Sequence, residues 1–257
     1  MTVKEIAVIG GGNGALTTAG DMALAGFNVR MWTVFPEEYG DLYETHTLKL
    51  RGLGRTGEAR KTDSSIEKLK QLYPAIHPVE NAFSVALLNV GPIIHSCLVL
   101  LNTGPIEHFE SWDIHNEGTT ASVKKLILAH DRERIALREA LGFTCHHYPF
   151  SDHYDQESEE PWMYGRKAHT DLVKSESWRE PLHFGHRYIT EDVKCNLALL
   201  TSIGDFAGQE TPIADSLLTL LGVIVGEDFR KTGRTLETLG LGQTEKEEME
   251  RILLQGL

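Results

Sequence analysis

Residues 4–27 read KEIAVIGGGNGALTTAGDMALAGF. The run at 5–9 is short and nearly all apolar, which is typical of a strand that is buried on both faces of a parallel sheet. The residues that follow satisfy the spacing G-x-G-x-x-[G/A], and residues 16–25 continue with a helical pattern that ends at Gly26. This order of strand, glycine turn and helix predicts a dinucleotide-binding unit.

The small residues of this loop have separate physical tasks. Gly10 makes the tight turn, Gly12 lets the backbone approach a pyrophosphate, and Ala15 allows the helix to pack closely on the strand. The free N–H groups and the positive dipole end of the helix would then hold the phosphates. We therefore predict that Gly10, Gly12, Asn13, Gly14 and Ala15 bind the cofactor.

The choice of dinucleotide depends on the second expected strand, residues 28–32. An acidic side chain at its end would accept the ribose hydroxyls of NAD, but Thr33 stands there and Glu37 and Glu38 follow a few residues later. Arg30 could meet the 2′-phosphate of NADP only if its side chain turned out of the strand. NAD is favoured, and NADP stays as the alternative.

Composition and charge limit the classes of function. With 257 residues, 41% of them hydrophobic, the chain can build the core of one large or two ordinary domains. A net charge of −12 would repel a phosphate backbone, so we expect no nucleic-acid partner. The three cysteines lie far apart without C-x-x-C spacing, which speaks against a zinc site. No basic region with an apolar core opens the sequence, so we expect a cytoplasmic protein.

A second region, residues 81–107, reads NAFSVALLNVGPIIHSCLVLLNTGPIE. Polar residues and Pro92 interrupt its apolar run and few basic residues flank it, so we expect a buried helix that is kinked near Pro92 rather than a membrane span. On such a helix Gly91, His95 and Asn102 share a face. A buried histidine needs a hydrogen-bond partner, so His95 is either a satisfied core residue or part of a site. The open space beside Gly91 favours a site.

The rest of the chain reads as mostly helical. We predict a long amphipathic helix at 120–141 whose charged stretch, 131–134, faces solvent, a helix from Thr211-Pro212 to Gly226, and a last helix capped at Thr244. The segment 143–178 is rich in histidines, acids and aromatics, and we interpret it as a polar loop over a pocket. Arg187 and Asp192 precede another apolar helix, where they are either ordinary caps and surface charges or part of a site.

The predicted fold class is α/β plus all-α. Residues 1–63 would form a partial dinucleotide-binding, Rossmann-like domain with a parallel sheet, and residues 64–257 a helical domain. A doubly wound domain has about six strands in two halves, whereas residues 1–62 can supply at most three or four short ones. The sequence around 61–65 has no room for the second half.

Four segments in this order carry a resemblance to a known family. They are GGGNGA, then N-V-G-P-I-I-H with L-L-N-T-G-P-I-E, then R-Y-I-T-E-D-V, and last D-F-R-K-T-G-R-T-L-E-T-L-G-L. Together they resemble the octopine/nopaline (opine) dehydrogenase family. The resemblance implies a Rossmann domain followed by an all-helical domain. It also implies reduction, with NAD(P)H, of the imine that forms between an α-keto acid and an amino acid.

The resemblance also suggests roles for individual residues. His95 resembles the catalytic histidine, Asp192 the aspartate that orients it, and Arg187 the arginine that binds a substrate carboxylate. Many members carry an asparagine one turn before the histidine, where this chain has Gly91, so either Asn89 or Asn102 takes that substrate-binding role or the role is lost.

A different class of function stays open at this point. The same sequence would fit a non-catalytic helical dimerisation or binding protein that carries a remnant cofactor loop, produced by an internal deletion or a gene-model join. In either case the helical domain offers a surface through which a homodimer could form, and no membrane partner is expected.

Overall fold

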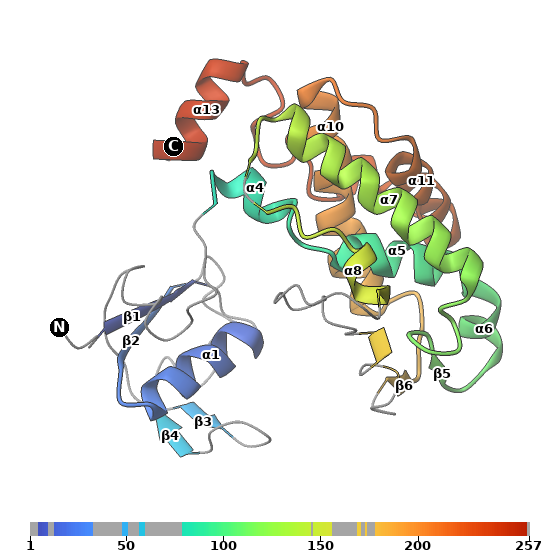
Figure 1. The fold of residues 1–257 in the computed structure, drawn as a ribbon, viewed down its shortest axis with the longest axis horizontal. Helices are drawn as coiled ribbons and strands as arrows, with labels where there is room; N and C mark the ends of the chain where they lie inside the picture. The colour runs from blue at the N-terminus through green and yellow to red at the C-terminus, as the bar shows by residue number, and fades with distance from the viewer. Residues whose placement is uncertain are drawn as a thin grey trace. The chain divides into compact units, whose positions relative to one another are not determined.

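The computed structural model describes residues 5–9, 13–32, 48–50, 57–59, 79–144, 146–155, 169–170, 173 and 178–255 (Figure 1). The chain divides into two compact units, Met1–His77 and Pro78–Leu257. The domain boundary expected between residues 63 and 64 lies outside the described residues.

The first unit contains a β-α-β element. It consists of strand β1 (Glu5–Ile9), helix α1 (Asn13–Leu24) and strand β2 (Asn28–Trp32). The two strands pair in parallel, with Val8 opposite Met31. A small core of Val8, Ala19, Met22 and Val29 joins the helix to the strands. Parallel pairing requires a crossover connection, and α1 is that crossover.

A second strand pair belongs to the same unit. Strand β3 (Leu48–Leu50) pairs antiparallel with β4 (Gly57–Ala59). Within the described residues, parallel pairing is therefore limited to β1 and β2. Gly10 and Gly12 lie outside the described residues, whereas Asn13 is the first residue of α1.

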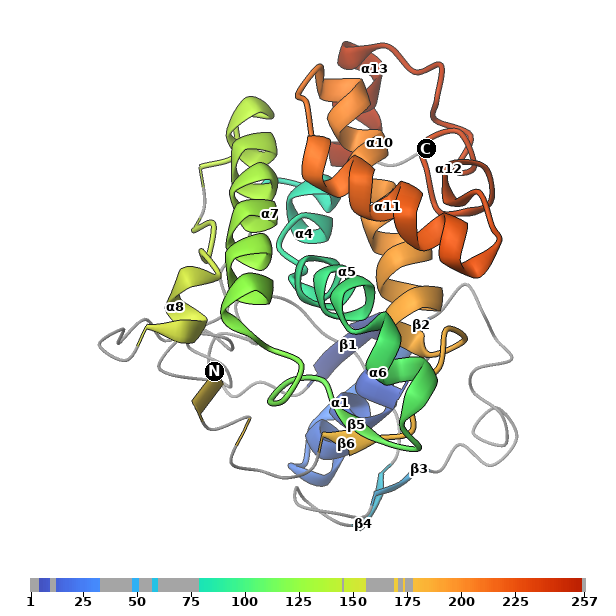
Figure 2. The ribbon, with the colours of Figure 1, turned by 90° about the vertical axis from the view of Figure 1, so that its right-hand side faces the viewer.

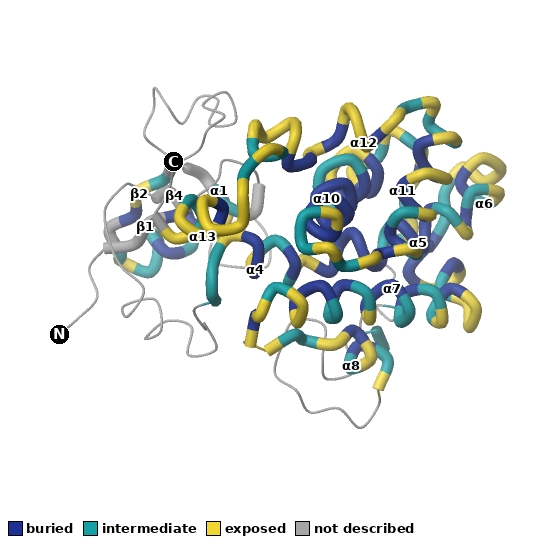
Figure 3. The backbone as a smooth tube through the Cα atoms, turned by 90° about the horizontal axis from the view of Figure 1, so that it is seen from above, coloured by how far each residue is buried: buried dark blue, intermediate teal, exposed yellow. Residues whose placement is uncertain are grey.

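The second unit is helical, as Figure 2 shows. Its helices are α4 (Ala82–Ala86), α5 (Gly91–Leu101), α6 (Thr103–His108), α7 (Ala121–Ala140), α8 (Ser151–Tyr154), the π-helix η2 (Tyr188–Leu197), α10 (Ala198–Ala207), α11 (Pro212–Val225), α12 (Phe229–Thr232) and α13 (Lys246–Gln255). Two short strands, β5 (Trp112–Asp113) and β6 (Arg179–Glu180), pair antiparallel. Helix α5 packs against η2, α7 and α11. Figure 3 shows buried positions concentrated on α5 and α10.

The apolar segment 81–107 is three helices, so the predicted single helix with a kink at Pro92 is wrong. Pro92 lies in the first turn of α5, where its missing N–H removes no hydrogen bond. By length and composition Ala82–Leu101 could cross a membrane, but most of it is buried within the unit, and Ile93 and Leu98 are fully buried. The segment is thus the core of the helical unit.

The long helix predicted at 120–141 is confirmed as α7, but its charged stretch does not simply face solvent. Asp131, Arg134 and Arg138 are buried. The Arg134 guanidinium donates to Asp131 Oδ1 at 2.7 Å, to the Leu87 carbonyl at 3.0 Å and to the carbonyls of residues 147 and 148. Arg138 donates to the Ser84 carbonyl at 2.7 Å. The last carbonyls of a helix lack helical partners, so these arginines satisfy the end of α4.

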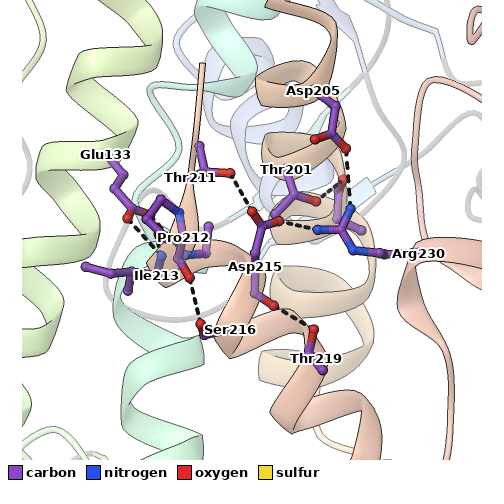
Figure 4. Close-up of polar contacts among 12 residues, drawn as sticks. Glu133, Thr201, Asp205, Thr211, Pro212, Ile213, Asp215, Ser216, Thr219 and Arg230 are labelled. Carbon is purple, nitrogen blue, oxygen red and sulfur yellow. Dashed lines mark hydrogen bonds and ion pairs between the residues drawn. The ribbon is translucent and has the colours of Figure 1, made fainter. Parts of the chain in front are cut away.

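A carboxylate of α7 also caps α11. Glu133 accepts a hydrogen bond from the backbone N–H of Ile213 at 2.8 Å (Figure 4) and another from the N–H of Ala214 at 3.0 Å. Thr211 occupies the predicted N-cap position, but its side chain makes no capping bond, and its hydroxyl bonds to Asp215 at 3.4 Å instead. A negative charge at a helix N-terminus is favourable, so Glu133 fastens α11 to α7.

Replacing Arg134 tests the buried network. Arg134→Met removes the ion-pair partner of Asp131 and a hydrogen-bond donor from three carbonyls, so it should lower the free energy of unfolding by about 3–5 kcal/mol. Arg132→Met, on an exposed position of the same helix, is the matched control and should change it by less than about 0.5 kcal/mol. Urea unfolding measures both. Equal effects of the two substitutions would contradict the network.

Candidate functional site

His95 and Asp192 lie in contact although 97 residues separate them in sequence. Nδ1 of His95, on α5, is 2.8 Å from Oδ2 of Asp192, on η2. The two side chains are 13% and 5% exposed. An ionised carboxylate only accepts hydrogen bonds, so this contact places a proton on Nδ1 and leaves Nε2 for exchange with a ligand. Within the described part of the chain, no hydrogen bond is made to Nε2.

Gly91 makes room for the Asp192 carboxylate at the start of α5. A Cβ atom on Gly91 would overlap Asp192 Oδ1 and lie 3.2 Å from its Cγ. Asn89 is exposed, and its side-chain oxygen accepts the Gly91 N–H at 2.9 Å. The glycine is therefore required by the aspartate, and Asn89 caps the first turn of the helix that carries His95.

The π-helix η2 carries the other half of the site. In a π-helix each N–H bonds to the carbonyl five residues earlier, and such segments are rare and frequent at functional sites. The carbonyl of Lys194 accepts a hydrogen bond from the N–H of Arg234 at 2.9 Å. A Cβ on Gly233 would overlap that carbonyl, so glycine is needed there for close packing. Asp192 precedes the apolar helix α10, as expected, but it already lies inside η2, which runs directly into α10.

Arg187 lies at the N-cap of η2 and is largely accessible. Its side chain is 56% exposed, and Nη2 is 3.3 Å from Oε2 of Glu191, which is 61% exposed. Exposed ion pairs of this kind contribute little free energy. The guanidinium can therefore leave Glu191 for another carboxylate at small cost.

The side-chain amide of Asn102 forms all its hydrogen bonds within the protein. It is 4% exposed, and its amide donates to the Leu98 carbonyl at 2.9 Å and the Gly118 carbonyl at 3.1 Å. Its oxygen accepts from Trp112 Nε1 at 3.0 Å. Both amide protons and the oxygen have partners, so we do not place Asn102 among the ligand-binding residues. It holds the junction between α5 and α6.

Aromatic neighbours that sequence reasoning did not identify surround His95. The ring of Tyr188 stacks on it, with 3.8 Å between centroids, and the ring of His115 meets it edge-on at 5.5 Å. Burial lowers the pKa of His115 to about 3, and repulsion from neighbouring histidines, first His95, adds to the effect. One sequence signal could have indicated Tyr188: it stands four residues before Asp192, so on a helix the two side chains lie on the same side.

Known proteins share sequence with most of this chain. Residues 78–225 match the family model described as NAD/NADP octopine/nopaline dehydrogenase, alpha-helical domain. An opine dehydrogenase of Arthrobacter sp. (strain 1C) is 31% identical over 187 residues, which cover 71% of this chain and 50% of that protein.

Solved structures show the same fold. Octopine dehydrogenase in complex with NADH and agmatine superposes with a TM-score of 0.60 at 15% identity, covering 95% of this chain and 99% of that one. Octopine dehydrogenase structures with NADH and pyruvate or L-arginine give a TM-score of 0.58 over the same coverage and at the same identity. The chain spans about half the length of the curated relatives it matches.

A methyl group at position 91 should disturb the pair of side chains. Gly91→Ala forces Asp192 away from α5, so the free energy of unfolding should fall by about 1–3 kcal/mol, as in overpacked sites. Gly104→Ala on α6 is the matched control, because a Cβ there meets nothing within 4 Å. Since alanine favours helices, the control should be neutral or up to about 1 kcal/mol more stable. Urea unfolding would contradict the close approach of Asp192 to Gly91 if both substitutions changed the free energy of unfolding in the same direction.

The buried His115 ring should make stability depend on pH. The unfolded chain binds a proton near pH 6.5, whereas folded His115 does so only near pH 3. Its contribution to stability is therefore complete above pH 6.5 and is lost as the pH falls toward 3. Removing this ring in His115→Gln should reduce the loss of unfolding free energy between pH 6 and 5 by up to about 1.4 kcal/mol per pH unit.

The control for this measurement is His108→Gln, which removes an exposed histidine of the same unit. Urea unfolding at several pH values should show the wild-type slope for this variant. An unchanged slope in His115→Gln would show that the His115 ring takes up its proton as readily in the folded chain as in the unfolded one.

Proposed function

Because the chain belongs to the octopine/nopaline dehydrogenase family, we propose that it is an NADH-dependent oxidoreductase that joins an α-keto acid to an amino acid and reduces the resulting imine. The observation that carries this proposal is the contact of His95 with Asp192 inside the segment that matches the family's helical domain. The related solved structures hold NADH with pyruvate, L-arginine or agmatine, which supports the two substrate classes.

The first unit fits the cofactor at its β-α-β element. Helix α1 starts at Asn13, directly after the glycines at 10–12, and connects two parallel strands. Backbone N–H groups at this helix N-terminus suit a pyrophosphate, so Asn13, Gly14 and Ala15, with Gly10 and Gly12, would hold the dinucleotide in a Rossmann-type arrangement. When bound, NADH supplies the hydride. NADH is favoured over NADPH because the related structures contain NADH.

His95 would handle the proton of the reaction. Asp192 fixes the proton on Nδ1, so Nε2 is the atom that gives a proton to the departing hydroxyl during imine formation or takes one from the amino group. The carboxylate also stabilises the imidazolium that exists while both nitrogens are protonated.

Arg187 would bind a substrate carboxylate. A guanidinium matches a carboxylate with two parallel hydrogen bonds, which an ammonium group cannot do. Arg187 is more than half exposed, and among the described residues its guanidinium pairs only with the surface carboxylate of Glu191. It is thus available to the keto acid or to the amino acid.

The direct test is NADH oxidation by the wild-type chain. Oxidation should require an α-keto acid and an amino acid together, and the product should contain a new secondary amine detected by mass spectrometry. Gly12→Val should abolish it, because a side chain there blocks the approach of backbone to the pyrophosphate. If the wild-type chain neither binds nor oxidises NADH, the proposal is overturned and a non-catalytic helical protein is favoured.

A double-variant experiment tests whether His95 and Asp192 act as one unit. His95→Gln and Asp192→Asn should each lower kcat by about 10²- to 10⁴-fold, the usual contribution of acid–base catalysis. The double variant should be no slower than the slower single variant, because either change already removes the shared function. Steady-state kinetics would contradict the unit if the two losses multiplied.

A conservative substitution tests the carboxylate site. Arg187→Lys keeps the charge but loses the paired hydrogen bonds, so KM for one of the two substrates should rise by about 5- to 150-fold, equivalent to about 1–3 kcal/mol. Lys194→Arg, on the same helix, is the matched control and should keep both KM values. Unchanged KM values in Arg187→Lys would leave Arg187 as a surface residue.

A further inference from the structure

Tyr188 lies flat against the face of the His95 ring. The centroids are 3.8 Å apart and the rings are inclined by only 17°. Tyr188 is the first residue of η2 and is 3% exposed, so this contact is a built part of the helical unit. A ring stacked this closely covers one whole face of the imidazole.

The hydroxyl of Tyr188 is fixed at its far end. It lies 3.1 Å from Nε2 of His115, which follows β5, and 3.2 Å from Oε1 of Glu180, on β6. An ionised carboxylate accepts, so the hydroxyl donates to Glu180 and accepts from the Nε2–H of His115. Burial, more than the nearby Glu180 carboxylate, raises the pKa of Tyr188, so the phenol keeps this proton. The paired strands β5 and β6 thereby hold the tyrosine ring in place.

Helix η2 therefore contacts His95 from two directions. Asp192 holds Nδ1 in the plane of the ring, and Tyr188, four residues earlier, holds the face. A single hydrogen bond would let the imidazole swing about the line from Nδ1 to the carboxylate, which would move Nε2 away from its target. The stacked ring prevents that swing.

We propose that Tyr188 is a positioning residue whose stacked ring keeps His95 Nε2 aimed at the substrate. This inference rests on the proposed function, because it requires His95 to exchange a proton with the substrate. It adds to that function a second constraint on the histidine besides Asp192, one that comes from an aromatic face.

Two variants of Tyr188 and one control separate the effect of its ring from that of its hydroxyl. Tyr188→Phe keeps the stacked ring and should retain kcat within about threefold, whereas Tyr188→Leu removes it and should lower kcat by about 3- to 30-fold at unchanged KM for both substrates. Tyr154→Phe removes a hydroxyl elsewhere in the unit and should match the wild type. Each kcat is normalised to the folded fraction seen in NMR spectra of the same samples.

The NMR spectra also report the contact without any turnover. The ring protons of His95 should resonate upfield in the wild type and in Tyr188→Phe, because they lie over an aromatic face, and should lose this shift in Tyr188→Leu. Unshifted protons in the wild type, a Leu variant with full kcat, or a Phe variant as slow as the Leu variant would each overturn the inference. A wild-type chain without turnover would contradict the proposed function, whereas the ring-proton shifts would still decide whether Tyr188 holds His95.

Discussion

The hydrogen bond between His95 and Asp192 is the contact on which the helical unit's site depends. It forms because α5 and η2 approach closely, and Gly91 permits that approach by leaving the carboxylate the volume of a missing side chain. The π-helical turn places Asp192 and Tyr188 against the same imidazole. Proton transfer requires one ring orientation, so the site's chemistry follows from how these two helices pack.

Buried charges hold the scaffold around this contact. Arg134 and Arg138 satisfy carbonyls at the end of α4, and Glu133 satisfies N–H groups at the start of α11. Helix α7 is thus joined to the segments before and after the site by polar groups as well as by apolar packing. Hydrogen bonds are directional, whereas apolar packing is not, so these bonds define the position at which α5 begins more precisely than apolar packing alone would.

The sequence predicted the elements whose signals are local. Helices α7 and α11 were expected from apolar periodicity and from glycine and proline at their ends, and both are present. The meeting of His95 with Asp192 was expected from the family resemblance, since no spacing rule connects residues so far apart. The burial of Arg134 and the full satisfaction of Asn102 were missed because their partners come from distant segments. A π-helix was also not recognisable, since its apolar pattern over ten residues resembles that of an α-helix.

Transfer of deuterium from labelled NADH tests the central claim most directly. The wild-type chain would be given NADH that carries deuterium at the transferable position, together with an α-keto acid and an amino acid, and the product analysed by NMR and mass spectrometry. We predict a secondary amine with one deuterium on the former keto carbon, formed by His95→Gln at a much lower rate. Deuterium in a hydroxy acid without a new carbon–nitrogen bond, or no transfer at all, would contradict the account.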